Sequence, residues 1–305
     1  MDNIYFNLAV VHGASVLFRF GDTVAGKLTS LVSELRMQWY NSSNDQANTS
    51  IAAAAELWNG LGMLKLPGNI YARFPSMGLP QGAAGRTYEI IFRIPDGAQG
   101  IGSPVQWQTL FFGGNDTRAG QIIAFYPDLA QSVQVSLYGD FFSFDFAINR
   151  GKFYVLTVTV DAVGKCTLFV DGTKIQSKNF AGAPSTGTAQ AYFNVHGSTD
   201  YVGQIIDYVG FGVWCRVNTD DEILARHQAA MAKWKVAGVA ALDTGAKASK
   251  VLVRDWATHR TLADATLASD GSWGVYTPQG DFEVVALGPA GYRPVCDGPV
   301  TAVAV

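Results

Sequence analysis

Charge is scarce in this chain of 305 residues, because only 15% of them are charged and no run of lysines or arginines occurs. The formal net charge is −3. Proteins that bind nucleic acid present a basic face, so the composition argues against nucleic acid as a partner. A surface with so few charges also suggests that a protein partner covers part of it.

Cysteine is equally sparse, with Cys166, Cys215 and Cys296 as the three thiols. An odd number at wide spacing predicts neither a disulfide framework nor a zinc site, so we expect buried, reduced thiols. The apolar stretch 8–20 is interrupted by polar residues and a glycine, which makes it unsuitable as a signal peptide or membrane span. We therefore expect a protein made in the cytoplasm and not inserted in a membrane.

Catalytic motifs are also missing from the sequence. It contains no Gly-x-Ser-x-Gly elbow and no phosphate-binding glycine loop, and its four histidines stand apart. Retaining glycoside hydrolysis needs two carboxylates close together across one bond. Asp145 and Asp207 are each the single acid on their predicted strands, 142–148 and 204–208. We expect no enzymatic activity, with glycoside hydrolase as a distant alternative.

Short strand patterns dominate what is present. Aromatic residues make up 12% of the chain, and 33 glycines punctuate it. Aromatic and β-branched residues alternate in runs bounded by turn-forming residues, as at 88–94, 153–161, 165–170 and 204–216. Many short antiparallel strands at near-regular spacing predict an all-β fold with a large jelly-roll sandwich.

One helix is predicted at the end of this sandwich. Thr219-Asp220-Asp221-Glu222 is a capping box, in which the hydroxyl and the carboxylate satisfy free backbone N–H groups at a helix start. Five further strand patterns between residues 236 and 287 predict a second, small β-sandwich. We place the two domains at residues 1–234 and 235–305, with the helix running up to the boundary.

Two motifs of the first domain resemble a known fold family. Residues 165–172, Lys-Cys-Thr-Leu-Phe-Val-Asp-Gly, are similar to the hairpin of the concanavalin A-like lectin/glucanase superfamily, most closely its laminin-G-like branch. Residues 203–211, Gly-Gln-Ile-Ile-Asp-Tyr-Val-Gly-Phe, resemble the closing strand of that family. The resemblance implies a jelly roll, and it implies no particular activity because the superfamily has many functions.

The second domain resembles the small prealbumin-like sandwiches related to carboxypeptidase regulatory domains, through residues 251–255, 260–262, 269–273 and 280–287. Modules of this kind, with the trailing Tyr-Arg-Pro and Gly-Pro-Val-Thr, resemble those on virion proteins of tailed bacteriophages. The pairing implies a structural virion protein of the tail, a fibre or the capsid surface. Such a protein would dock on other virion proteins, as a homo-oligomer or in several copies.

A lectin-like carbohydrate-binding module is the main alternative function, with a cell-surface glycan as the partner. Such sites stack a sugar ring on an exposed aromatic side chain and hydrogen-bond it with amides or carboxylates. Trp39, Tyr40 and Asn41, and Trp107 with Gln108, have the required side chains. Tryptophans of a sandwich also fill its core, so both interpretations of Trp39 and Trp107 stay open.

Calcium is the one cofactor that the resemblance implies. Relatives in the superfamily bind this cation through loop carboxylates and carbonyls, which are the oxygen ligands that it prefers. Asn115, Asp116, Asp140 and Asp200 lie in expected turns that would meet at one edge of the sandwich. Simple turn formation by these residues is the alternative.

Overall fold

The computed structural model describes residues 4–41, 44–54, 57–59, 61–68, 70–75, 79–96, 108–113, 121–126, 132–137, 140–184, 190–194, 205–231, 234–240, 248–265, 267–277, 280–288 and 295–304. The chain forms a larger unit, Gly13–Leu224, and a smaller unit of Met1–His12 with Ala225–Val305. The smaller unit therefore begins before the predicted boundary at residue 234. It also takes in an N-terminal segment that the sequence patterns did not assign to it.

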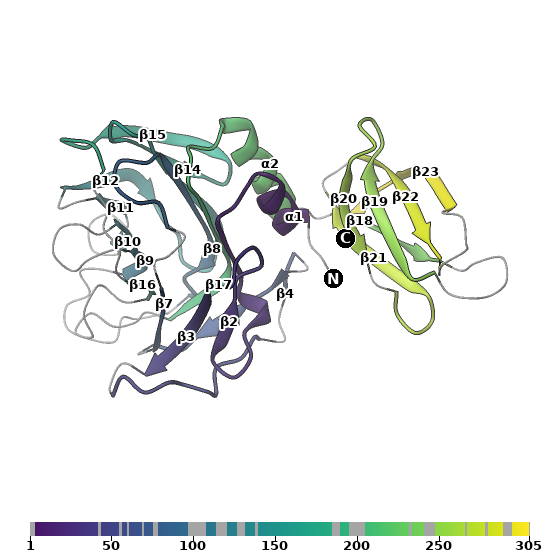
Figure 1. Cartoon of the computed structure of the whole chain (residues 1–305), viewed down its shortest axis with the longest axis horizontal. Helices are drawn as coiled ribbons and strands as arrows, with labels where there is room; N and C mark the ends of the chain where they lie inside the picture. Colours follow the sequence, from purple (N-terminus) through teal and green to yellow (C-terminus); the bar gives the residue numbers. More distant parts are fainter. Residues whose placement is uncertain are drawn as a thin grey trace. The chain divides into compact units, whose positions relative to one another are not determined.

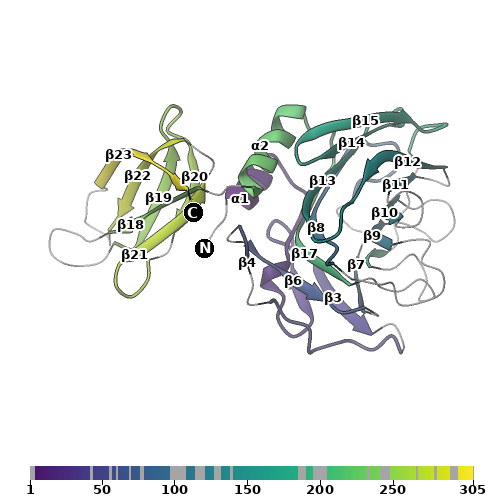
Figure 2. The same ribbon diagram turned by 180° about the vertical axis from the view of Figure 1, so that it is seen from behind.

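Two antiparallel sheets face each other in the larger unit (Figure 1 and Figure 2). The seven-stranded sheet has the order β1 (Val16–Arg19), β17 (Ile206–Trp214), β8 (Arg86–Arg93), β13 (Phe153–Val160), β14 (Lys165–Val170) and β15 (Thr173–Asn179), and β6 (Leu64–Leu66) also pairs with β17. The eight-stranded sheet has the order β12 (Asp140–Ala147), β11 (Ser132–Leu137), β10 (Gln121–Tyr126), β9 (Gln108–Gly113), β16 (Gln190–Phe193), β7 (Ile70–Pro75), β3 (Arg36–Asn41) and β2 (Lys27–Thr29). A 3-10 turn, η1 (Phe20–Asp22), and the hairpin of β4 (Leu57–Trp58) and β5 (Leu61–Gly62) complete this unit, and the predicted all-β class is confirmed.

The hairpin of β13 and β14 illustrates how local sequence sets this architecture. Alternate residues of β13 face the core, while Gly164 takes a φ of +93° in the predicted turn. The Asp161 carboxylate accepts hydrogen bonds from the backbone N–H groups of Val163 and Lys165, at 3.0 and 2.8 Å. These bonds fix the turn, and the strands pair from Val160 with Cys166 onward.

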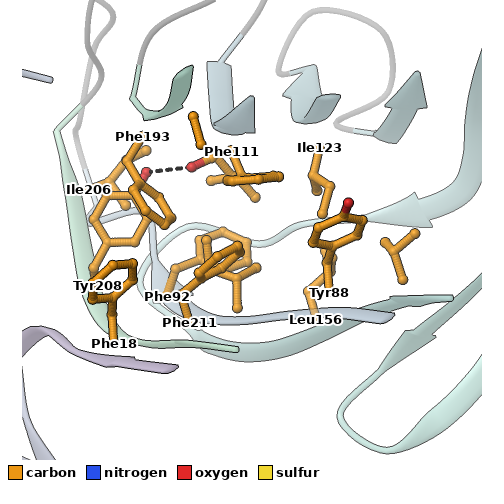
Figure 3. Close-up of a cluster of buried hydrophobic side chains, with 14 of the residues drawn as sticks. Phe18, Tyr88, Phe92, Phe111, Ile123, Leu156, Phe193, Ile206, Tyr208 and Phe211 are labelled. Atoms are coloured by element: carbon orange, nitrogen blue, oxygen red, sulfur yellow. Dashed lines mark hydrogen bonds between the residues drawn. The ribbon is translucent and has the colours of Figure 1, made fainter. Parts of the chain in front are cut away.

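Aromatic side chains from both sheets fill the core, as Figure 3 shows. Phe111 of β9 lies 4.7 Å from Phe211 of β17 between ring centres, and Phe193 of β16 meets the same ring edge-on at 4.8 Å. The buried Tyr208 hydroxyl donates to the Leu110 carbonyl at 3.1 Å, which joins the two sheets. Burying each such side chain stabilises the fold by about 1.5–3 kcal/mol.

The predicted capping box is confirmed at the start of α2 (Asp220–Ala230). Glu222 N–H donates to the Thr219 hydroxyl at 3.2 Å, and Thr219 N–H donates to the Glu222 carboxylate at 3.0 Å. The helix is shorter than predicted, however, because it ends at Ala230 and Trp234 already begins a strand.

The smaller unit has two antiparallel sheets of its own and the N-terminal helix α1 (Ile4–Val11). One sheet has the order β21 (Ser272–Thr277), β18 (Trp234–Val239) and β24 (Val303–Ala304), and the other β20 (Thr261–Ala265), β19 (Lys250–Asp255), β22 (Asp281–Leu287) and β23 (Val295–Thr301). Val251, Val253 and Phe282 are among its buried residues, and Asn7 of α1 donates a hydrogen bond to Leu262 O at 3.1 Å. Neither helix in the described part of the chain is long and apolar enough to span a membrane.

None of the three cysteines is in a disulfide, and only one of them is buried. Cys166 lies in the core of the larger unit, and its burial raises the pKa of the thiol above its ordinary value. Cys215 and Cys296 are exposed, so the expectation of three buried thiols is wrong for these two.

Candidate functional site

The outward face of the eight-stranded sheet carries the first candidate residue, Tyr40. On β3, Met37 and Trp39 are buried in the core, at 1% and 0% exposure. Successive side chains of a strand point to opposite faces, so Gln38 and Tyr40 point outward. Both are half-buried.

Strand β7 continues this face beside β3. Ala72 and Phe74 point into the core, which leaves Tyr71 and Arg73 on the outer side. The register pairs Tyr40 directly with Tyr71. Residues paired in this way share one face of a sheet, so the two tyrosines are neighbours there.

Three tyrosines from three neighbouring strands form a row on this face. The rings of Tyr40 and Tyr71 stack, with centres 5.6 Å apart and planes inclined by 21°. Tyr192 of β16 follows, with its ring centre 6.4 Å from that of Tyr71. Tyr71 is only 3% exposed, whereas Tyr40 and Tyr192 at its sides are half-buried and accessible.

Arg73 and Asp45 supply polar groups beside this row. The guanidinium carbon of Arg73 lies 4.0 Å from the centre of the Tyr40 ring, within cation–π range. Its Nη1 is 3.4 Å from the Asp45 carboxylate, which also accepts a hydrogen bond from the Tyr71 hydroxyl. Burial and this hydrogen bond raise the pKa of Tyr71 above its ordinary value, so the phenol stays a neutral donor.

A short backbone ladder holds Asp45 in place. Asn41 N–H donates to Gln46 O at 2.9 Å, and Asn48 N–H donates to Trp39 O at 2.8 Å. The Asn48 side-chain amide donates to the Asn41 side-chain oxygen at 2.7 Å. The segment around Asp45 is therefore fastened to the end of β3, and its carboxylate reaches the outward face from there.

The structure separates the first group of predicted sugar-binding residues. Trp39 is fully buried, and its ring packs in the core with its centre 6.2 Å from that of Phe20. It is not available to stack on a sugar, so the prediction for Trp39 is corrected to a core role. Tyr40 lies on the outward face, and Asn41, the last residue of β3, accepts a hydrogen bond from the Asn48 amide.

The second group is described only in part. Trp107 lies outside the described residues, and Gln108 begins β9, where it pairs with Phe125 of β10. That pairing tests no contact of the Gln108 side chain, so its role in binding sugar stays a prediction.

The predicted calcium ligands lie largely outside the described residues too. Asn115, Asp116 and Asp200 belong to segments that are not described, and Asp140 is the first residue of β12. Within the described part of the chain, no three acidic, histidine or cysteine side chains gather as a metal site would require. The calcium site therefore stays a prediction.

The two acids considered for glycoside hydrolysis belong to different sheets. Asp145 of β12 is exposed and accepts a hydrogen bond from the Gln176 amide of β15 at 3.2 Å. Asp207 of β17 is 2% exposed and forms an ion pair with Arg93 of β8. Both carboxylates thus have structural partners in the sandwich.

Sequence reasoning missed four residues of the outward face: Tyr71, Arg73, Asp45 and Tyr192. Tyr71 and Arg73 stand two residues apart in Ile-Tyr-Ala-Arg-Phe, which is the spacing of one strand face, but Tyr71 is nearly as apolar as its neighbours and leaves the period-2 signal weak. Asp45 is held by a short segment after β3, and Tyr192 lies on β16, but both meet Tyr71 only because distant strands pair, which no local pattern indicates.

A single exposed aromatic side chain also occurs among the described residues of the smaller unit. Trp256, after β19, is 41% exposed. Its ring covers Gly298, where an added Cβ would lie only 2.7 Å from the nearest ring atom. His259 meets the ring edge-on, with centres 6.2 Å apart. No stacked row comparable to the three tyrosines accompanies it in the described part of this unit.

Neither a family model nor a curated protein sequence matches the chain. Solved structures do share its fold. Domain 4 of AbnA, an extracellular GH43 arabinanase from Geobacillus stearothermophilus solved with arabinotriose, is similar at a TM-score of 0.52 and 15% identity, over 70% of this chain and 98% of that one.

Binding domains of botulinum neurotoxins are similar as well. That of serotype G has a TM-score of 0.52 at 11% identity, over 95% of this chain and 71% of that one. For type C, whose cell entry depends on two ganglioside molecules, the TM-score is 0.54 at 10% identity, over 91% of this chain and 66% of that one. At these identities the likeness shows a shared β-sandwich fold.

Proposed function

We propose that this chain is a non-catalytic glycan-binding protein whose larger sandwich binds sugar on the outward face of β3, β7 and β16. The observation that carries the proposal is the row of Tyr40, Tyr71 and Tyr192, with Arg73 and Asp45 beside it. Aromatic rings offer an apolar surface to the C–H face of a pyranose. The Arg73 guanidinium can donate hydrogen bonds to the sugar hydroxyls, and the Asp45 carboxylate can accept hydrogen bonds from them.

The structural likenesses support this choice over the other functions considered. Similar folds include a domain solved with arabinotriose and the binding domain of a botulinum neurotoxin solved with SialylT. Those ligands belong to those proteins, and the fold alone is shared. These structural likenesses nevertheless favour glycan binding over a purely structural role. Docking on a bacteriophage virion stays a prediction, which co-sedimentation of the purified chain with assembled particles would test.

A glycan array followed by titration calorimetry on the full chain tests the proposal. We expect a bound oligosaccharide, and about tenfold weaker binding for Tyr40→Ala and for Tyr192→Ala, since a lost aromatic contact of about 1.4 kcal/mol corresponds to that factor. Trp256→Ala is the matched control, because it removes an exposed aromatic ring from the other unit. Binding that survives both tyrosine substitutions, or is abolished by the control, contradicts the assignment.

Calcium is tested in the same titrations. The superfamily that the first domain resembles includes members that bind this cation through loop oxygens, so we expect EDTA to weaken sugar binding if the predicted calcium site supports the loops of the sandwich. Unchanged affinity in EDTA would show that the tyrosine row binds sugar without a metal ion.

A further inference from the structure

Basic side chains extend the candidate sugar-binding face toward the edge of the sheet. Lys27 of β2 pairs with Gln38 of β3, Gln38 pairs with Arg73 of β7, and Arg73 pairs with Tyr192 of β16. Directly paired residues share a face, so these four side chains form one row on the outward side. Arg36 lies two residues before Gln38 on β3 and points to the same side.

These cations lie close enough to serve one ligand. Neighbouring strands are about 4.8 Å apart, and residues two apart on a strand are about 6.8 Å apart. Lys27 and Arg73 lie two strands apart, on either side of Gln38. Arg36 lies two residues before Gln38 on β3. The charged ends of these long side chains therefore border the same patch as the tyrosine row.

The local charge is positive although the chain as a whole is negative. Lys27 and Arg36 are exposed, and neither makes an ion pair or a side-chain hydrogen bond within the described residues. The Nη1 of Arg73 lies 3.4 Å from the Asp45 carboxylate, which also binds the Tyr71 hydroxyl. Exposed Glu34 lies in the turn between β2 and β3. Among the described residues, counting these two acids against the three cations leaves a charge of +1 here (3 − 2), against −3 for the chain.

We infer that the glycan bound at the tyrosine row is anionic, and that its carboxylate or sulfate group lies toward Lys27 and Arg36. This inference depends on the proposed function. A neutral sugar would use the tyrosines, Arg73 and Asp45, and would leave two unpaired cations beside it. A guanidinium matches the geometry of a carboxylate or a sulfate, and a nearby ammonium adds attraction for any anion.

The test compares pairs of oligosaccharides that differ only in charge. The full chain is titrated with a neutral glycan, with the same glycan carrying a sialic or uronic acid, and with a sulfated form. We expect at least one charged form to bind about fivefold more tightly than the neutral glycan, as two partly exposed ion pairs would give. Raising the salt from about 50 to about 300 mM should reduce that advantage.

Variants locate the effect on the sheet. Lys27→Gln with Arg36→Gln should remove the preference for the charged glycan and leave binding of the neutral form unchanged. Lys174→Gln is the control, because it removes an exposed lysine from β15 of the other sheet. A preference for the carboxylate form over the sulfate, or the reverse, identifies which anion the face selects.

Two results would overturn the inference. Equal affinity for neutral and charged forms would exclude an anionic ligand and leave the proposed glycan-binding function standing. A preference that persists in the double variant would place the anion elsewhere on the chain. Binding of none of the three glycans, in contrast, would count against the proposed function itself.

Discussion

Replacing Asp207 by alanine should destabilise the larger unit by about 2–4 kcal/mol. Asp207 of β17 is 2% exposed and accepts two hydrogen bonds from Arg93 of β8, at 2.7 Å from Nε and 2.5 Å from Nη2. Removing one partner of a buried pair costs about 3–5 kcal/mol, because the other charge is left uncompensated. Arg93 is 21% exposed and can turn toward water, which places the expected cost lower.

A double substitution separates the cost of an unpaired charge from the loss of packing. Arg93→Met with Asp207→Ala should recover at least about 1 kcal/mol of the loss, since no charge is then left unpaired. Recovery will be incomplete, because the Arg93 guanidinium also lies 4.6 Å from the centre of the Phe153 ring. Asp145→Ala removes an exposed carboxylate and should change stability by less than about 0.5 kcal/mol.

Guanidinium chloride unfolding measures these differences. The chain has two compact units, so the curve should be fitted with two transitions. The midpoint and slope of each transition give its free energy of unfolding, and the transition of the smaller unit serves as an internal reference. The reasoning is refuted if Asp207→Ala costs no more than Asp145→Ala, or if the double variant is as unstable as the single one.

Two further substitutions test other parts of the larger unit. Gly26→Ala should cost more than about 1 kcal/mol, because an added Cβ would lie only 1.8 Å from Asn48 O. The clash would displace the segment that carries Asp45, so sugar binding should weaken as well. Gly82→Ala, also at positive φ but in open space, is the thermal-melting control, and equal losses would exclude the clash. Burial raises the pKa of Tyr208, so its contribution to stability is full below the unfolded pKa of about 10 and is lost as pH rises from there toward the folded pKa. Unfolding measured between pH 9 and 11 should show a smaller loss of stability in Tyr208→Phe than in the native chain, and equal losses would contradict this.

The main sandwich was predictable because its strands alternate clearly and end at strong turn signals. The hairpin at Gly164 and the capping box at Thr219 are local features, and both form as the sequence indicates. Strand β7 was not predicted, because its outward positions include Tyr71, which is nearly as apolar as its inward neighbours. A strand whose two faces look alike gives a weak alternation signal.

The candidate site shows what residue types alone leave undetermined. Trp39 and Tyr40 are adjacent, and either ring has the chemistry to bind a sugar. Which of them faces solvent depends on the phase of β3, and a shift of one residue exchanges the two faces. That phase is set by the pairing of β3 with β7 and by the burial of Met37 beside Trp39. The pattern in residues 26–40 alone did not define it.

The hydrogen bonds within the tyrosine face bear on where its affinity comes from. Tyr71 and Arg73 already have a partner in Asp45, so a sugar would exchange these bonds for its own and gain little from them. The same bonds hold the side chains in place, which lowers the cost of ordering them when a ligand binds. Net affinity then depends on contacts that are absent before binding. These are contacts with the parts of Tyr40 and Tyr192 that remain accessible and, for an anionic sugar, attraction to Lys27, which has no partner within the described residues.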